Sequence, residues 1–128
     1  MLLDVKRLLG SLYEEYDYEF DPAWVEGEIP KDLFGSYFRN GPGLQVASER
    51  YTRHAFDGDG MVCCFSFRDG RAWFRNKFVR TKGFVQEQAA GRPLFRSAFT
   101  KGSADGSPFF NPFDLDMKNV ANTGGWCG

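Results

Sequence analysis

The string His54-Ala-Phe-Asp-Gly-Asp-Gly-Met61 holds the most distinctive group of polar side chains in this sequence. Asp57 and Asp59 are spaced so that both could offer carboxylate oxygens to a hard cation such as Ca²⁺. The further acidic positions and the closing glutamate of an EF-hand loop are missing. We therefore interpret His54, Asp57 and Asp59 as a structural turn whose aspartates bond to nearby backbone amides, with a Ca²⁺-binding module as the weaker alternative.

Histidine limits the possible chemistry most, because His54 is the only one in 128 residues. A metal centre built mainly from imidazole ligands cannot be assembled from this sequence alone. A lone histidine beside a turn is more often a hydrogen-bonding group than a general base, and nothing else supports a Ser-His-Asp triad. Cys63, Cys64 and Cys127 lack zinc-like spacing, and their odd number predicts reduced thiols.

The charge balance argues against a nucleic-acid partner. Sixteen basic and 17 acidic residues give a net charge of -1, whereas phosphate binding needs a basic surplus. No stretch approaches the ~20 apolar residues that span a bilayer. Asp4, Lys6 and Arg7 interrupt the apolar N-terminus, so no signal peptide is predicted, and the expected location is the cytoplasm or plastid stroma, with possible peripheral membrane contact.

A β-hairpin is the clearest local prediction. Residues 61–68 and 71–81 alternate between apolar and polar positions, with Cys63, Phe65 and Phe67 on one face of the first strand. Asp69-Gly70 between them is typical of a type I′ turn. The basic residues of the second strand are expected on the face nearer to water.

Other elements are predicted on either side of this hairpin. Apolar residues recur at helical spacing over residues 2–12 and predict a short amphipathic helix. Residues 35–39 predict a short strand, which residues 40–43 should break because they contain glycine and proline. Residues 84–90 predict one or two helical turns, ended by glycine and proline at positions 91 and 93.

Residues 94–113 predict a loop that is unusually rich in phenylalanine. If its aromatic side chains fold inward they belong to the core; if they project, they form an apolar patch of the kind that marks an interface or membrane contact. The candidate patch residues are Leu94, Phe95, Phe99, Phe109 and Phe110.

Short strands separated by glycine-rich turns predict an all-β fold of the propeller, sandwich or barrel type. We expect an N-terminal helix and lead-in over 1–20 and a partial propeller over 21–128. At roughly 40–50 residues per blade, the length would allow two to three blades, short of closure. The turn-rich sequence at residues 121–128 is unusual for a domain end and predicts a truncated form.

Four strings of the sequence carry further information through their order along the chain. They are Val25-Glu-Gly-Glu-Ile-Pro-Lys-Asp-Leu-Phe-Gly-Ser-Tyr-Phe-Arg-Asn-Gly-Pro-Gly43, Phe56-Asp-Gly-Asp-Gly-Met-Val62, Asn76-Lys-Phe-Val-Arg-Thr81 and Lys118-Asn-Val-Ala-Asn-Thr123. Together they resemble the N-terminal part of the carotenoid oxygenase family, which includes the carotenoid cleavage dioxygenases and apocarotenoid oxygenases. Each string is weak alone, and their shared order makes the resemblance specific.

The resemblance implies a seven-bladed β-propeller in which four histidines hold Fe(II) on the propeller axis. Glutamates behind these histidines support them. It implies that dioxygen cleaves a double bond of an apolar polyene, a carotenoid or apocarotenoid, into two carbonyl fragments. It also favours an exposed, membrane-facing position for Leu94, Phe95 and Phe99. None of the family's iron ligands matches a residue here, and His54 is not at a ligand position.

Two functional interpretations follow from the resemblance. The first is a truncated carotenoid cleavage dioxygenase that is inactive alone, with no catalytic or metal-binding residue and no cofactor of its own. The alternative is a non-catalytic structural fragment that binds a membrane or a partner.

Overall fold

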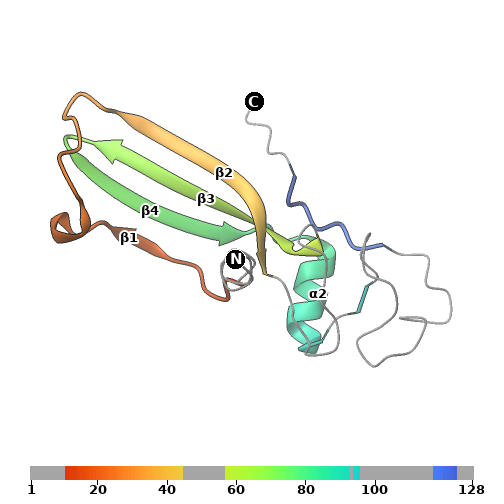
Figure 1. Ribbon diagram of the computed structural model, residues 1–128. Coiled ribbons are helices and arrows are strands. Elements are labelled where there is room, and N and C mark those ends of the chain that lie inside the picture. The colour runs from red at the N-terminus through yellow and green to blue at the C-terminus, as the bar shows by residue number, and fades with distance from the viewer. Residues whose placement is uncertain (1–10, 45–56, 93, 96–116, 124–128) are drawn as a thin grey trace, which may run out of the picture.

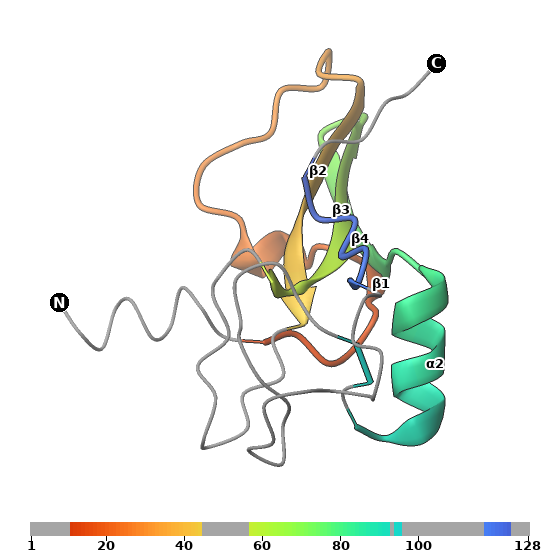
Figure 2. The same cartoon turned by 90° about the vertical axis from the view of Figure 1, so that its right-hand side faces the viewer.

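The computed structural model describes residues 11–44, 57–92, 94–95 and 117–123. Within them, four antiparallel strands form one sheet in the order β1-β4-β3-β2, and α2 lies at one end of that sheet (Figures 1 and 2). The all-β expectation is thus confirmed at the level of a mainly β chain with one short helix. The described residues contain a single sheet, and the number of blades in the whole chain stays a prediction. The elements are β1 (Asp17–Glu19), a 3-10 turn η1 (Pro22–Trp24), β2 (Gly35–Leu44), β3 (Asp59–Arg68), β4 (Arg71–Phe78) and α2 (Lys82–Ala90).

The predicted hairpin is confirmed as β3 and β4. Its two turn residues, Asp69 and Gly70, have φ angles of 52° and 75°, as a type I′ turn requires. Phe65 lies opposite Phe74 and Cys63 opposite Asn76, so the predicted alternation is also correct. The hairpin forms where the sequence places it because its turn and its strands favour the same local geometry.

β2 is longer than predicted. Residues 40–43 do not break the strand; β2 continues to Leu44, with a register irregularity between Pro42 and Leu44. An edge strand tolerates proline because its missing N–H need not serve a neighbour on the open side. The extension matters because it brings Asn40 and Gly41 alongside Val62 and Met61 of β3.

β1 is a strand that the sequence does not predict. It has three residues, too few for a periodic signal, and it falls within the region expected to be a helix and lead-in. Tyr18 of β1 lies opposite Phe74 of β4, and Asp17 forms a 2.6 Å ion pair with Arg75. The chain before residue 20 therefore contributes a strand to the sheet. The helix predicted over 2–12 lies almost wholly outside the described residues.

The two faces of the sheet differ in chemistry. One carries an aromatic cluster in which the Phe65 and Phe74 rings are 5.0 Å apart, with Tyr18 5.5 Å from Phe74. The other carries the basic residues of β4, and the side chains of Arg75 and Lys77 are 59% and 66% exposed. The predicted placement of basic residues on the wetter face is confirmed.

Glu15 ties the start of the described chain to the end of β4. Its Oε1 accepts a 2.9 Å hydrogen bond from the Phe78 backbone N–H, and Arg80 donates to the same carboxylate at 3.1 Å. The backbone hydrogen bond, helped by the charges of Arg80 and Lys77, lowers the pKa of Glu15 below its usual value.

The lowered pKa of Glu15 predicts a pH dependence of stability. A carboxylate whose pKa is lower in the folded state stabilises the fold above its unfolded pKa, about 4.3, and loses that contribution as pH falls through the folded value. Urea unfolding at several pH values should therefore show a loss of stability below about pH 4.3 that Glu15→Gln reduces. Glu28→Gln, at an exposed position, serves as the control. An unchanged pH profile in Glu15→Gln would contradict the assignment.

α2 begins and ends at recognisable signals. The Thr81 hydroxyl oxygen accepts a 3.1 Å hydrogen bond from the Phe84 N–H, and Gly91 closes the helix in the left-handed conformation with φ 63°. The predicted helical turns over 84–90 are confirmed and start two residues earlier, at Lys82. Phe84 is buried and stacks on Phe78 at 5.1 Å, which fixes α2 against the end of β4.

Candidate functional site

Three buried charged side chains meet where α2 approaches the start of β3. The Lys118 ammonium lies 2.6 Å from Asp59 Oδ1 and also donates a hydrogen bond to Glu87 Oε2. The side chain of Lys118 is fully buried, and those of Asp59 and Glu87 are 4% and 8% exposed. We call these three residues the Lys118 cluster. Two buried carboxylates thus share one cation, an arrangement that persists only when every partner is in place.

Each member of the Lys118 cluster comes from a different part of the chain. Asp59 begins β3, Glu87 lies in α2, and Lys118 lies in the segment 117–123, drawn in blue beside α2 and the start of β3 (Figures 1 and 2). Glu87 has a second role, since its Oε1 accepts backbone hydrogen bonds from Leu94 at 2.9 Å and Phe95 at 3.1 Å. The cluster therefore joins the sheet, the helix, the chain after the helix and the segment 117–123.

The segment 117–123 is also held through its backbone. The Gly60 N–H donates to the Val120 carbonyl at 2.7 Å, and the Asn40 amide donates to the Ala121 carbonyl at 3.0 Å. The Asn122 amide donates to the Gly58 carbonyl at 2.8 Å. This close approach leaves no room for a larger residue at position 60, where an added Cβ would stand 2.2 Å from the Ala121 oxygen.

The structure describes two of the three residues that the sequence predicts to form a structural turn. Asp57 and Asp59 are 1% and 3% exposed, and His54 lies outside the described residues. Asp59 binds an ammonium from the protein itself, which occupies the place that a Ca²⁺ ion would need beside that carboxylate. The interpretation of these residues as a structural turn stays a prediction. Sequence reasoning missed Lys118 and Glu87, although Lys118 opens one of the four strings that carry the family resemblance.

The residues of this chain do not fit the iron centre that the resemblance implies. Four imidazole ligands are needed, and the sequence contains one histidine. Among the residues that the structure describes, no three His, Cys, Asp or Glu side chains are grouped so that they could hold a metal ion. The two carboxylates of the Lys118 cluster, Asp59 and Glu87, already bind the Lys118 ammonium, which lies where a metal ion would have to bind. We therefore derive no reaction step through iron on this chain.

The candidate apolar patch is described only at its start. Leu94 and Phe95 are half-buried, and their backbone N–H groups bind Glu87. Phe99, Phe109 and Phe110 lie outside the described residues, so the patch as a whole stays a prediction. In the described part of the chain, no helix is long and apolar enough to cross a bilayer.

Cys63 and Cys64 are free thiols in β3, half-buried rather than fully enclosed. Burial raises the pKa of the Cys63 thiol, while the nearby charge of Arg39 opposes the shift. A raised pKa leaves less of the nucleophilic thiolate near neutral pH, which does not favour Cys63 as a nucleophile.

Comparison with known proteins identifies the family. The model of the family described as retinal pigment epithelial membrane protein, to which the carotenoid oxygenases belong, matches residues 10–125. This chain belongs to that family. The resemblance drawn from the four sequence strings is thereby confirmed.

Two relatives show the extent of the match. The apocarotenoid-15,15′-oxygenase of Synechocystis is 50% identical over 121 residues, which cover 94% of this chain and 24% of the relative. The beta,beta-carotene 15,15′-dioxygenase of mouse is 37% identical over 101 residues, covering 79% of this chain and 18% of the relative. The chain thus spans about a quarter or less of the length of these relatives.

The fold agrees with the sequence comparison. The crystal structure of cobalt-substituted Synechocystis apocarotenoid oxygenase superposes with a TM-score of 0.76 at 48% identity, covering 88% of this chain and 23% of the other. At 48% identity, the similar fold and the similar sequence both reflect membership of the same family. The sheet and helix in Figure 1 therefore recur within a larger oxygenase.

Proposed function

We propose that this chain forms part of a non-haem iron(II) dioxygenase, which oxidatively cleaves a double bond of a carotenoid or apocarotenoid. The observation that supports the proposal is that three of the four sequence strings that resemble the family contact one another in the structure. Asp59 and Gly60 of the second string bind Lys118 and Val120 of the fourth, and Asn40 of the first binds Ala121. Motifs that are weak in sequence thus form one connected structural unit.

The proposed role of residues 21–128, together with β1 before them, is to build part of a seven-bladed propeller. A four-stranded antiparallel sheet is the size of one propeller blade. The relatives named for apocarotenoid and carotene cleavage support the substrate class, an apolar polyene. Which double bond is cut depends on the substrate tunnel of the whole oxygenase.

We further propose that the 128 residues alone are inactive, because one histidine cannot replace four ligands. After anaerobic loading with Fe(II) and desalting, the purified 128-residue chain should retain far less than one iron per chain. Its mixture with an apocarotenal in air should not bleach faster than buffer containing the same iron. Stoichiometric iron together with bleaching by the chain alone would overturn the proposal.

The last part of the proposal is that the protein contacts a membrane peripherally, from the cytoplasmic or stromal side. Leu94, Phe95 and Phe99 lie close to one another in sequence at the start of the candidate patch. Replacing all three with serine should reduce flotation with phosphatidylcholine vesicles, because shallow insertion depends on buried apolar area. Val85→Ser is the matched control, since Val85 is 49% exposed on α2. Flotation that is equal in the triple variant and the wild type would remove this part of the proposal.

A further inference from the structure

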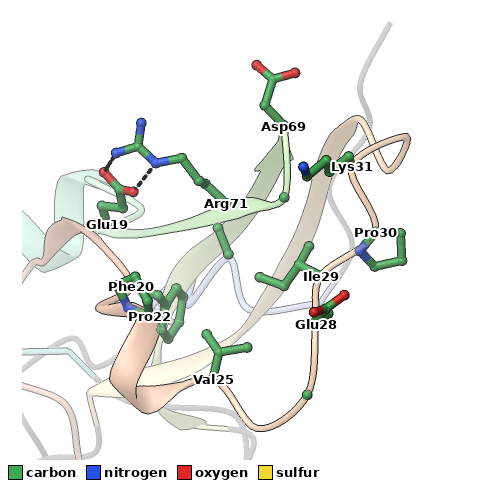
Figure 3. Close-up of a pocket in the computed structure, with 13 residues that line it drawn as sticks. Glu19, Phe20, Pro22, Val25, Glu28, Ile29, Pro30, Lys31, Asp69 and Arg71 are labelled. Carbon is green, nitrogen blue, oxygen red and sulfur yellow. Dashed lines mark hydrogen bonds and ion pairs between the residues drawn. The ribbon is translucent and has the colours of Figure 1, made fainter.

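A pocket opens on the other end of the sheet from the Lys118 cluster, between the loop after β1 and the turn of the β3–β4 hairpin. Its volume is about 590 Å³, within the range of ligand-binding pockets. Figure 3 shows the side chains of Val25 and Ile29 pointing toward the ring of Phe20. Ala72, 6% exposed, completes the apolar floor. The floor is therefore shaped to take a branched or flat apolar group.

The rim of this pocket is charged. Arg71 and Glu19 form a bidentate ion pair on one side (Figure 3), so these two charges neutralise one another. Glu28, Lys31 and Asp69 complete the charged lining. The loop wall is acidic beyond the lining itself: residues 17–32 contain six acidic residues and one basic residue.

Four carboxylates of that wall form no ion pair with another described residue. Asp17 and Glu19 are neutralised by arginines of β4, but the remaining acidic residues of the wall keep an unbalanced charge. These are Asp21, Glu26, Glu28 and Asp32. A negative wall beside an apolar floor favours an occupant that combines an apolar group with positive charge.

Exposed apolar side chains also lie among and beside the pocket-lining residues in the sequence. Trp24, between the lining residues Pro22 and Val25, is 68% exposed, and Leu33, two residues after Lys31, is 42% exposed. Large aromatic residues around a pocket are typical of protein interfaces, where they supply most of the binding energy. An exposed tryptophan beside the apolar floor and the acidic loop favours a peptide, which can contact all three, over a small molecule.

We propose that the pocket between Phe20, Val25, Ile29 and Ala72 is a docking site for a partner protein segment that presents one apolar anchor residue flanked by basic residues. The anchor enters the pocket, and the flanking charges lie against the carboxylates of residues 21–32. Nothing in this arrangement involves the Lys118 cluster or a polyene, so the docking site is independent of the proposed cleavage activity.

The test uses three blocked pentapeptides and the ¹⁵N-labelled chain. The first peptide has leucine between two arginines on each side, the second has serine in place of leucine, and the third has glutamates in place of the arginines. Amide shifts should move at Gly27, Gly70 and Ala72, and the first peptide should bind at least about tenfold more tightly than either of the others. Binding should weaken as salt is raised, since exposed charges are screened.

Variants separate the two parts of the recognition. Ile29→Glu should weaken binding of the first peptide about tenfold, because it removes an apolar side chain from the pocket floor. Glu28→Lys changes an exposed residue and leaves the floor intact, so it should weaken binding severalfold through charge alone. Val85→Glu, on α2, is the matched control and should leave binding unchanged. Circular dichroism melting curves verify that each variant is folded.

Four results would overturn the proposal. The first is equal binding of the leucine and serine peptides, which would show a non-specific charge effect. The second is shift changes that map to α2 or β2 instead of the pocket. The third is binding of isopentylamine as tight as that of the leucine peptide, which would make the pocket a small-molecule site. The fourth is concentration-dependent self-association that Ile29→Glu abolishes, which would make a second copy of this chain the occupant.

Discussion

Lys118→Ala is expected to lower the free energy of unfolding by about 3–5 kcal/mol. The change removes the ammonium that Asp59 and Glu87 share, while both carboxylates stay buried. A buried carboxylate that loses its counter-charge costs far more than a solvated one, so the loss exceeds what the contact itself contributes. Urea denaturation followed by circular dichroism measures the change.

Lys77→Ala is the matched control for Lys118→Ala. Lys77 also faces a carboxylate, Glu15 at 3.7 Å, but its side chain is 66% exposed. An exposed pair of this kind is worth less than about 1 kcal/mol. Similar losses in the two variants would show that burial of the Lys118 cluster does not determine its contribution.

The second large effect is expected for Gly60→Ala, with a loss of about 2–3 kcal/mol. A Cβ at this position would stand 2.2 Å from the Ala121 oxygen and 2.9 Å from the Val120 oxygen. Both atoms belong to backbone, so a side-chain rotation cannot relieve the overlap. The segment 117–123 must move away, and the 2.7 Å bond from the Gly60 N–H to Val120 is lost with it.

Gly41→Ala is the control for Gly60→Ala. Gly41 lies in the neighbouring strand, opposite Met61, and no atom lies within 4 Å of the Cβ that alanine would add. Replacing glycine at an open strand position reduces the entropy of the unfolded chain, so the effect should be small or slightly stabilising. A similar loss in both variants would mean that strand glycines matter for another reason than the approach of Ala121.

The elements that sequence predicts correctly are those whose signal is local. The Asp69-Gly70 turn, the alternation on either side of it and the glycine after α2 are each defined within a few residues. The prediction for β2 is too short because proline is tolerated where its missing N–H faces no neighbouring strand, and β2 lies at an edge of the described sheet. β1 escapes prediction because three residues carry no periodicity, and its pairing with β4 is a tertiary contact.

The Lys118 cluster could not be predicted from the residues alone. Lys118 is 59 residues from Asp59 and 31 from Glu87 in sequence, and no spacing rule joins a turn, a helix and an irregular segment. A single lysine is also far more often exposed than buried. Only the family resemblance marks both the Asp59 and the Lys118 strings, and it does so without indicating that they meet.

We predict that the described residues form a structural unit of a carotenoid oxygenase, which the Lys118 cluster stabilises. The most direct measurement replaces the matching segment of Synechocystis apocarotenoid oxygenase, where identity is 50%, with residues 10–125 of this chain and assays polyene cleavage and iron content. We predict an iron-containing, active chimera whose activity and iron are lost when Lys118→Ala is added. A chimera that folds and holds iron but cleaves no polyene, or one that Lys118→Ala leaves unchanged, would contradict the claim.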